Sequence, residues 1–569
     1  MQRKLQGALS VCLAAAGLLS FVNLASAQAG AGGNPVDNLP TPQRAPAGNE
    51  PAGRILTAPQ PSQPVVSRAV TPQRFDIEGV NAIPFDDVAN LFKPLVNQPG
   101  TVAQLTELAK QCTALYQQHG FALSFCYVPQ QEFAGGVVRV IAVEGHVETV
   151  KIEGDAGPAE ARIRELAERI RADRPLTLAA FDRYTQLMSQ LPGVQVQASA
   201  TPPAATDGAG SMLLKVDRRP YGVSVGTDFR SSSPRAVLTG TVNDPIVAGG
   251  ALSASTLVGT GNDERFYAGA YTQAVGTEGL TLKGELSMFK GDPDASRNIT
   301  PAIRRYNNYR RAELSASYPL LLKRSESLLL SGGLYATNNT DDYTNPLNGA
   351  RLRDDVEVRA VYAQAAYAAS TPTQARALSL RLVQGLNGLG AEATRRANFT
   401  NAPLVNDARI DFTRVVLEGS QRNTWGEGGA WGTGISFATQ YSPHNLPSTE
   451  RISFGSTRFG RAYQAGEIAG DKGWGLGLEL NRTFGLGMDY IKQVQPYVLL
   501  ETAHTSLQSG TAAISKLTSA SLGFRLTDNN YYRIDLAASK PLGDASPYNP
   551  SRDLRFSALL TYSFSKVKP

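Results

Sequence analysis

Over its C-terminal three-fifths the chain alternates apolar and polar residues with a period of two. Between Tyr221 and Phe564 about sixteen segments of about 9–14 residues follow this pattern. In the segment GLTLKGELSMF, for example, the apolar residues on one face are Leu280, Leu282, Leu286 and Met288. Because successive side chains of a β-strand point to opposite faces, the pattern predicts strands with one apolar and one polar face.

Two architectures have strands of this kind. In a soluble sandwich the apolar faces meet in a dry core, whereas in a membrane barrel they face lipid and the polar faces line a lumen. Tilted strands of about 9–11 residues suffice to cross a bilayer. Short turns also alternate with long polar loops (292–309, 338–356 and 388–406), and the aromatic-rich last strand LRFSALLTYSF can close the sheet. The sequence therefore favours a transmembrane β-barrel over residues 219–569, with the sandwich as the competing interpretation.

The stretch before the barrel has helical periodicity and is repeated. Residues 73–147 show the order strand, helix, helix, strand, strand, with a first helix predicted over 85–92. Thr101 and Gln104 form a capping box that predicts the start of the second helix. Residues 148–218 repeat the order, with helices in AEARIRELAERIR and LAAFDRYTQLMSQL. Two tandem modules of about 75 residues predict a binding arm ahead of the barrel.

The N-terminus predicts export from the cytoplasm. Arg3 and Lys4 precede an apolar run and a small-residue cleavage site at 25–27, which is the pattern of a secretory signal peptide over residues 1–27. Residues 28–72 are rich in Pro, Gly, Ala and Gln and are predicted to be a flexible linker. An oxidising compartment permits a disulfide between Cys112 and Cys126, while two separate thiols remain the alternative.

Composition and charge exclude several classes of function. The net charge of +6 comes from 55 basic and 49 acidic residues that are spread evenly, so a nucleic-acid partner is not expected. The four histidines lack metal-ligand spacing, and local motifs suggest no Ser-His-acid order. We therefore expect no enzyme, no cofactor, no metal site and no small-molecule substrate.

Together the modules and the barrel resemble a known family. LYQQHGFALSFCYVPQQEFAGGVVRVIAVEGHVETVKIEG and LPGVQVQASA resemble the first and second POTRA domains of two-partner secretion transporters. These are the TpsB-type, ShlB/FhaC/HecB haemolysin secretion/activation proteins of the outer-membrane barrel-assembly superfamily. The resemblance implies two periplasmic POTRA domains of βααββ order, followed by a 16-stranded antiparallel barrel in the outer membrane. Many relatives carry a plug helix before these domains, but the prolines of 28–72 argue against a long helix here.

The stretch GRAYQAGEIAGDKGWGLGLEL resembles the signature loop of that family, at about 452–473. The resemblance implies that this loop joins strands eleven and twelve and folds back inside the barrel. The motif residues would be Phe459, Gly460, Arg461, Ala462, Tyr463, Gly470, Asp471 and Gly473. Asp471 is predicted to support a tight turn. An ordinary solvated surface loop is the alternative interpretation.

In the family the motif arginine pairs with an acid in a Phe-x-Asp-x-Gly motif. The matching stretch here is YVLLETAHT, in which Glu501 takes the place of the acid, Leu499 that of Phe and Ala503 that of Gly. We expect the Arg461 guanidinium to clamp the Glu501 carboxylate through charge-assisted hydrogen bonds.

The resemblance implies protein export. The POTRA pair would capture an unfolded, large secreted passenger of TpsA type, β-helical once folded, by strand addition at the edge Val194, Gln195, Val196 and Gln197. The passenger would then cross the barrel, whose other partner is outer-membrane lipid. The rivals are an assembly factor that inserts other barrels, which usually has three or more POTRA domains, and a passive porin, which needs no periplasmic arm. A soluble adhesin is the third rival interpretation.

Overall fold

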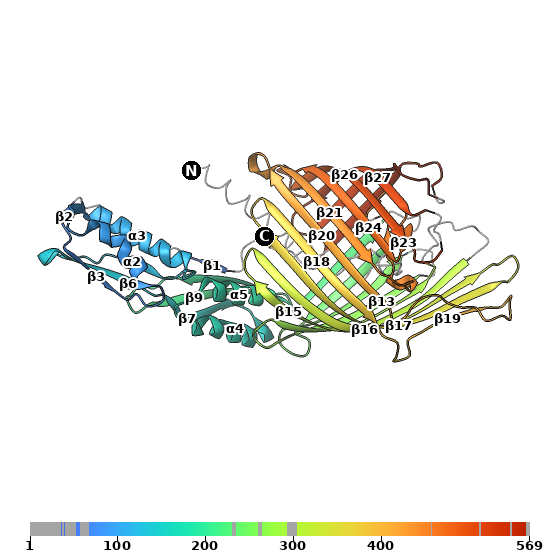
Figure 1. Cartoon of the computed structure of the whole chain (residues 1–569), viewed down its shortest axis with the longest axis horizontal. Helices are drawn as coiled ribbons and strands as arrows, with labels where there is room; N and C mark the ends of the chain where they lie inside the picture. The colour runs from blue at the N-terminus through green and yellow to red at the C-terminus, as the bar shows by residue number, and fades with distance from the viewer. Residues whose placement is uncertain are drawn as a thin grey trace.

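The computed structural model describes residues 36, 39, 53–56, 68–229, 235–259, 264–292, 304–456, 458–510, 514–546 and 549–564. Two small α/β domains lie in a row at one end of a large β-barrel (Figure 1). The predicted signal peptide, residues 1–27, and most of the predicted linker, residues 28–72, lie outside the described residues. In the described part, no helix has the length and apolar character needed to cross a membrane.

The first domain has the predicted order of strand, two helices and two strands. Its elements are β3 (Arg74–Glu78), α2 (Phe85–Phe92), α3 (Val102–Gln118), β5 (Phe125–Tyr127) and β6 (Val137–Val143), with a small pair of β2 (Ala69–Val70) and β4 (Gly100–Thr101). Strand β6 lies between β3, which is parallel to it, and β5, which is antiparallel. The predicted capping box at the start of α3 is present: the Thr101 hydroxyl accepts from the Gln104 N–H, and the Gln104 side chain accepts from the Thr101 N–H.

A disulfide crosses the core of the first domain. It joins Cys112 of α3 to Cys126 of β5, with 5.8 Å between the two Cα atoms. Both cysteines are buried among apolar side chains such as Leu105, Tyr116 and Val140. The bridge therefore ties the long helix to the sheet on which it packs.

The second domain repeats the order and gains a strand from the linker. Its elements are β7 (His146–Gly154), α4 (Glu160–Ala172), α5 (Leu178–Ser189), β8 (Val194–Thr201) and β9 (Ala209–Arg218). The sheet order is β1-β8-β9-β7, in which β1 (Gly53–Ile55) comes from the stretch that the sequence predicts to be a flexible linker. A strand of three residues is too short to leave a periodic signal, which is why the composition of 28–72 hides it.

The barrel is closed and has sixteen strand positions. Strands β18 and β19 both pair with β17 and form one position, and β24 and β25 both pair with β26 and form another. The ring closes between its first and last strands. The strands are β10 (Tyr221–Asp228), β11 (Arg235–Asn243), β12 (Gly250–Gly259), β13 (Arg265–Val275), β14 (Leu280–Gly291), β15 (Arg304–Leu322), β16 (Glu326–Thr344), β17 (Arg351–Ser370), β18 (Gln374–Gly385), β19 (Glu392–Ala397), β20 (Thr413–Trp425), β21 (Trp431–Tyr441), β24 (Lys472–Arg482), β25 (Phe484–Gly485), β26 (Gln493–Ser506), β27 (Lys516–Thr527), β28 (Tyr532–Pro541) and β29 (Arg555–Ser563).

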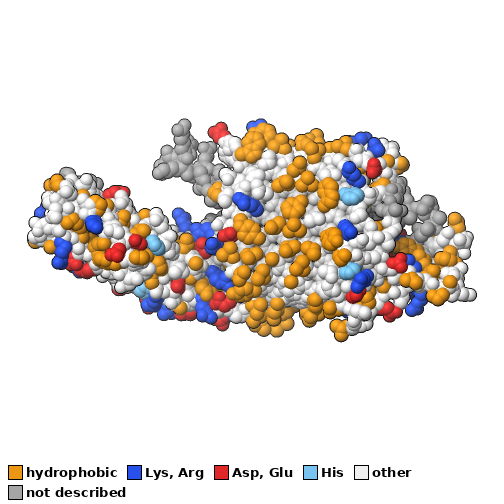
Figure 2. Space-filling view, in the orientation of Figure 1, with side chains coloured by type: hydrophobic (Ala, Val, Ile, Leu, Met, Phe, Trp, Pro, Cys, Tyr) orange, Lys and Arg blue, Asp and Glu red, His pale blue; other side chains and the backbone are white. Residues whose placement is uncertain are grey.

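The apolar faces of these strands point outward. Leu286, Leu314 and Phe556 are exposed by 66%, 60% and 72% of their surface, which is the arrangement of a wall that faces lipid. Figure 2 shows hydrophobic side chains gathered over the outer wall of the barrel. On the opposite faces, Glu501 of β26 is buried and Asp535 of β28 is partly buried inside the barrel. The prediction of a barrel with apolar outer faces is confirmed, and the soluble sandwich is excluded.

The second domain is fixed to one end of the barrel. Arg183 of α5 donates hydrogen bonds to the carbonyl oxygens of Pro319 (3.1 Å) and Glu278 (2.8 Å), which lie at the near ends of the strands. Leu322 of β15 is buried in the core of this domain, together with Leu187 of α5. The domain thus packs on the barrel through both charged and apolar side chains.

Candidate functional site

The barrel contains an inward loop, residues 442–471, between its eleventh and twelfth strand positions. Inside it, β22 (Ile452–Phe454) and β23 (Ile468–Gly470) pair as a short antiparallel sheet. Buried side chains of the loop pack against wall residues in one cluster: Ile452, Phe454, Ala462, Tyr463 and Ile468 with Ala438, Ala503 and Leu517. The loop is therefore folded against the inner wall and is not a solvated surface loop.

Two glycines permit this close packing. Gly455 has φ of +127°, and a Cβ there would lie 2.0 Å from the carbonyl oxygen of Gln464. Gly475 lies on β24 where the Phe459 ring covers the wall, and a Cβ there would approach that ring to 2.6 Å. Any larger residue at either position would push the loop away from the strand.

The guanidinium of Arg461 is bonded to Asp535 and not to Glu501. This group lies 3.2 Å from the Asp535 carboxylate on β28, donates to the Tyr497 hydroxyl and lies over the Tyr497 ring at 5.5 Å. The Tyr497 hydroxyl in turn donates to Asp535 at 2.6 Å. Asp535 also accepts from Arg525 at 3.3 Å, so one carboxylate lies between two guanidinium groups.

The predicted clamp between Arg461 and Glu501 is therefore corrected in its geometry. The Glu501 carboxylate accepts from the backbone N–H groups of Gly460 (3.2 Å) and Arg461 (2.8 Å), and from the Ser519 hydroxyl (3.2 Å). Glutamate is one methylene longer than the aspartate of the motif, and here its carboxylate oxygen reaches the backbone N–H groups of the loop. Glu501 therefore still binds the motif of the inward loop, but it does so through backbone N–H groups and not through the guanidinium.

The prediction that Asp471 supports a tight turn is wrong. Asp471 is fully buried at the junction of β23 and β24. Its carboxylate accepts from the N–H groups of Leu446 and Gln508, each at 2.8 Å, and from Arg451 at 3.2 Å. Asp471 thus joins the start of the inward loop and the segment after β26 to its own position. The chain continues from β23 directly into β24 and makes no tight turn at Asp471.

The remaining motif residues lie where the loop meets the wall. Phe459 packs edge-on against Phe454, with 5.8 Å between ring centroids. Gly470 and Gly473 run beside β26, where a Cβ would lie within 2.6 Å of the Ser506 carbonyl oxygen and 2.8 Å of the His504 carbonyl oxygen. Ala462 and Tyr463 are buried, and the Tyr463 hydroxyl is 3.3 Å from the Thr518 carbonyl oxygen.

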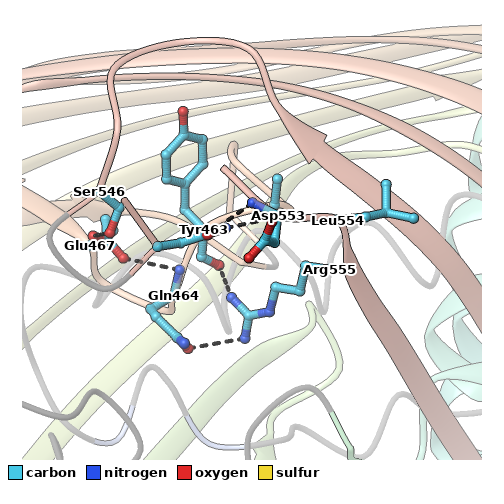
Figure 3. A pocket seen from close by; sticks show the side chains of 9 residues that line it. Tyr463, Gln464, Glu467, Ser546, Asp553, Leu554 and Arg555 are labelled. Atoms are coloured by element: carbon cyan, nitrogen blue, oxygen red, sulfur yellow. Dashed lines mark hydrogen bonds between the residues drawn. The ribbon is translucent and has the colours of Figure 1, made fainter. Parts of the chain in front are cut away.

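Beside Tyr463 the loop lines a small pocket with the segment that joins β28 to β29 (Figure 3). Arg555 donates to the Tyr463 carbonyl oxygen and, at 3.0 Å, to the Gln464 side chain. Ser546 donates to Glu467, whose carboxylate also accepts from the Gln464 N–H at 3.1 Å. These bonds fasten the tip of the loop to the last hairpin of the barrel.

The base of the loop is held by the opposite wall. Glu450 is buried, pairs with Arg414 of β20 at 2.8 Å and accepts from the Tyr335 hydroxyl of β16 at 2.9 Å. Strand β16 is the seventh position of the ring and β28, which carries Asp535, is the fifteenth, so the two are eight of sixteen positions apart. The inward loop therefore spans the bore from one wall to the facing one.

Asp535, Tyr497, Glu450 and Arg414 are site residues that the sequence analysis did not assign. Asp535 stands on the polar face of YRIDLAA, and a carboxylate on the inner face of a membrane strand is a signal that it needs a charged partner. Glu450 carries no such signal, because it precedes the recognised motif and its partners come from distant strands.

The predicted docking edge lies in β8 of the second domain. Val194 and Val196 are buried in the domain core, while Gln195 and Gln197 are only partly buried. Strand β8 pairs antiparallel with β9 along its whole length. On its other side, Ala198, Ser199 and Ala200 pair with β1.

Two described residues that precede β1 in the sequence, Val36 and Leu39, pack against the barrel wall. Leu39 is buried in a cluster with Val237, Phe266, Phe289 and Tyr309. Phe266 and Phe289 are buried while their neighbour Tyr267 is exposed on the outer face, so the cluster is on the inner face of the wall. Of the described residues before the first domain, Val36 and Leu39 therefore contact the inner wall of the barrel, and β1 contacts the second domain.

Two family models match the chain. Residues 70–145 match the POTRA domain of ShlB type, and residues 262–526 match the haemolysin secretion/activation protein ShlB/FhaC/HecB. The first match covers the first βααββ domain, and the second covers most of the barrel together with the inward loop.

The curated proteins that are similar to the chain include two transporters. One is the outer membrane transporter CdiB of Escherichia coli, 23% identical over 189 residues, which are 33% of this chain and 32% of CdiB. The other is the heme/hemopexin transporter protein HuxB of Haemophilus influenzae, 20% identical over 496 residues, which are 80% of each protein. The chain thus aligns with about a third of CdiB and four-fifths of HuxB.

Solved structures share the fold. CdiB from Escherichia coli superposes with a TM-score of 0.65 at 18% identity, over 89% of this chain and 93% of that one. BamA from Haemophilus ducreyi lacking POTRA domains 1–3 gives 0.53 at 14% identity, over 87% of this chain and all of that one. At such identities the likeness shows the fold alone, so the assignment to a family comes from the two family models.

Proposed function

This chain belongs to the ShlB/FhaC/HecB family of outer-membrane two-partner secretion transporters, and from that premise we propose how it moves its partner protein. Its second N-terminal domain receives the unfolded passenger in the periplasm. The inward loop keeps the bore closed until the passenger arrives, and the passenger then crosses the barrel to the cell surface.

The span of the inward loop carries this proposal. The loop is bonded through Glu450 to β20 and β16, and through Arg461 to the facing strand β28. Because these bonds link opposite walls, a polypeptide passes only if at least one set is released. Ion pairs suit this role, because they are not covalent and can separate when other polar or charged groups replace their partners.

The passenger is a large secreted protein of TpsA type that forms a β-helix outside the cell. The outer membrane has no nucleotide supply, and folding at the surface gives the movement its direction. An extended, unfolded chain can add to a sheet edge through backbone hydrogen bonds without a fixed sequence, which suits the second domain. For the charged groups of the lumen we propose the role of a wet lining and no catalysis.

Deletion of the gene tests the proposal. One large exoprotein should remain in the periplasm or be degraded there, while the other outer-membrane barrels keep their normal abundance. A general loss of outer-membrane barrels would instead identify an assembly factor. Unchanged secretion together with lower permeability to small solutes would identify a porin.

A further inference from the structure

The outer faces of β24, β26, β27 and β28 carry basic side chains and no acidic ones. Side chains alternate between the two faces of a strand, and exposed Leu478, Leu500 and Leu522 mark the outer face of the first three of these strands. Leu536 pairs with Phe524 of β27 and marks the same face of β28. Counted in steps of two from these residues, no position on this face holds Asp or Glu. The basic residues on it are Lys472, Arg482, His504, Lys516 and Lys540.

All of these basic residues except Arg482 lie at the strand ends farthest from the two N-terminal domains. Strand β10 is the first position of the ring and follows the second domain directly, so every strand at an even position begins at the far end. Strand β24 is the twelfth and begins at Lys472, and β27 is the fourteenth and begins at Lys516. His504 and Lys540 lie near the last residues of β26 and β28, at the same end. Because the domains lie in the periplasm, this end of the wall lies in the outer leaflet of the membrane.

Aromatic side chains place these residues at the level of the lipid headgroups. Trp474, His504 and Lys516 are directly paired neighbours and form one row across β24, β26 and β27. The Lys472 ammonium lies 5.1 Å from the centroid of the Tyr441 ring. Trp474 and Tyr441 are both exposed on the wall. Tryptophan and tyrosine in such positions mark the boundary between the apolar part of a membrane and water.

The charges of the three lysines are not neutralised within the protein. In the described part of the chain, Lys472, Lys516 and Lys540 form no ion pair with a carboxylate. The outer face of β17 differs, since there Arg359 pairs with Glu357 and Arg353 with Asp355, each at 2.9 Å. Ammonium groups without a carboxylate partner, set above an apolar wall, are suited to an anion that is itself part of a lipid.

We propose that Lys472, Lys516 and Lys540, with His504 and Trp474, form a binding surface for the phosphate groups of a phosphorylated glycolipid of the outer leaflet. Strands lie about 4.8 Å apart and rise about 3.4 Å per residue, so the backbones of Lys472 and Lys516 are about 12 Å apart. A disaccharide with a phosphate at each end can contact both ammonium groups while its acyl chains lie on the leucines below.

The position of this surface connects it to the inward loop. Glu501 of β26 and Asp535 of β28 bind the loop from the inner faces of the same strands. A lipid bound across the outer faces of these strands therefore braces the part of the wall to which the loop is bonded.

Binding of a defined lipid tests the proposal. The probe is bisphosphorylated lipid A, added to the delipidated full-length protein in detergent, and native mass spectrometry measures its affinity. The test variant is Lys472→Gln, Lys516→Gln and Lys540→Gln in one chain. Each lysine near an anionic lipid contributes about fivefold to binding, so this variant should bind lipid A about a hundredfold more weakly than the wild type. Equal affinity of the two proteins would overturn the proposal.

A second variant controls for net charge. Lys151→Gln, Lys215→Gln and Lys323→Gln remove the same number of charges from the second domain and from the turn after β15. This variant should bind lipid A as the wild type does. An equal loss in both variants would show an effect of net charge alone and would overturn the proposal.

Two further lipids test the chemistry of the occupant. Lipid A without its phosphates should bind the wild type and the test variant equally weakly. If the wild type binds it as tightly as the bisphosphorylated form, the apolar wall alone explains the binding and the proposal fails. Equal affinity of the wild type for phosphatidylglycerol would also overturn the proposal, because the surface would then accept any anionic lipid.

Discussion

Asp535 is shared by two arginines, and one of them belongs to the inward loop. Arg461 lies 3.2 Å and Arg525 3.3 Å from its carboxylate, while Arg525 has a second partner in Glu479 at 2.6 Å. Removal of Asp535 would leave Arg525 with Glu479 and deprive Arg461 of its carboxylate. Loss of Asp535 should therefore affect Arg461 of the loop more than it affects Arg525.

We predict that Arg461→Ala and Asp535→Asn both cripple export while the barrel still inserts. Breaking one partner of a buried charge pair costs about 3 kcal/mol, or about a hundredfold in the occupancy of the bonded loop. Secretion of the partner protein, normalised to folded barrel in the membrane, measures the effect. Asp411→Asn is the matched control, since Asp411 forms an exposed pair with Arg409. If the two losses add fully in the double variant, the residues do not act as a pair.

Glu501→Gln should be milder than Arg461→Ala. Glu501 accepts from two backbone N–H groups and a hydroxyl, and the amide oxygen of glutamine can still accept from them. We expect export within about threefold of the wild type, because only the charge-assisted part of these bonds is lost. A loss as large as that of Arg461→Ala would instead point to a side-chain pair between Arg461 and Glu501 in the working state.

These residues show what sequence can predict at this scale. The motif placed Arg461 and an acid on neighbouring parts of the lumen, which is where both lie. It assigned the guanidinium to Glu501 and not to Asp535, because the pairing depends on the curvature of the wall, which brings Asp535 of β28 within reach of Tyr497 of β26 across β27. Asp535 and Glu450 come into reach only through the closed ring of strands.

Among the elements, α3 and β5 of the first domain are joined by the bridge between Cys112 and Cys126, which are 14 residues apart. In the chain-entropy picture a loop of about 15 residues contributes about 3 kcal/mol to stability. We predict that Cys112→Ala with Cys126→Ala destabilises the first domain by that amount and leaves the barrel unchanged. Hydrogen exchange of α3 and β5 in the full-length protein measures it, with β26 and β27 as internal controls. Equal protection in both proteins would contradict the prediction.

The long elements were predictable, whereas three short strands in the linker and the inward loop were not. The capping box at Thr101 and Gln104 and the alternation in GLTLKGELSMF come from local chemistry, and both correspond to elements of the structure. Strands β1, β22 and β23 have three residues each, too few for a period to show. Their pairing depends on surfaces contributed by other parts of the chain.

On the scale of the whole molecule, Arg183 holds the second domain against the barrel. It donates to the Pro319 and Glu278 carbonyl oxygens and lies over the Tyr318 ring at 5.7 Å. Sequence reasoning could not find this contact, because the acceptors are main-chain oxygens, which every residue carries and which leave no signal in the sequence.

We predict that Arg183→Ala loosens the second domain from the barrel. Each lost bond from a charged donor removes about 1.5–3 kcal/mol, so the distribution of distances between spin labels on α4 and β20 should broaden. Arg164→Ala is the matched control, since Arg164 pairs with Glu160 within α4. An unchanged distribution would show that the apolar contact of Leu322 with the domain core suffices on its own.

The closure of the ring has a mechanical consequence. Among the described residues, β10 and β29 are joined by five paired residues, whereas β16 and β17 are joined by 19. A cylinder stretched from within yields where its circumference is held by the fewest bonds. Cargo thicker than a single extended chain would therefore split the wall between β10 and β29, at the strand that follows directly from the second domain.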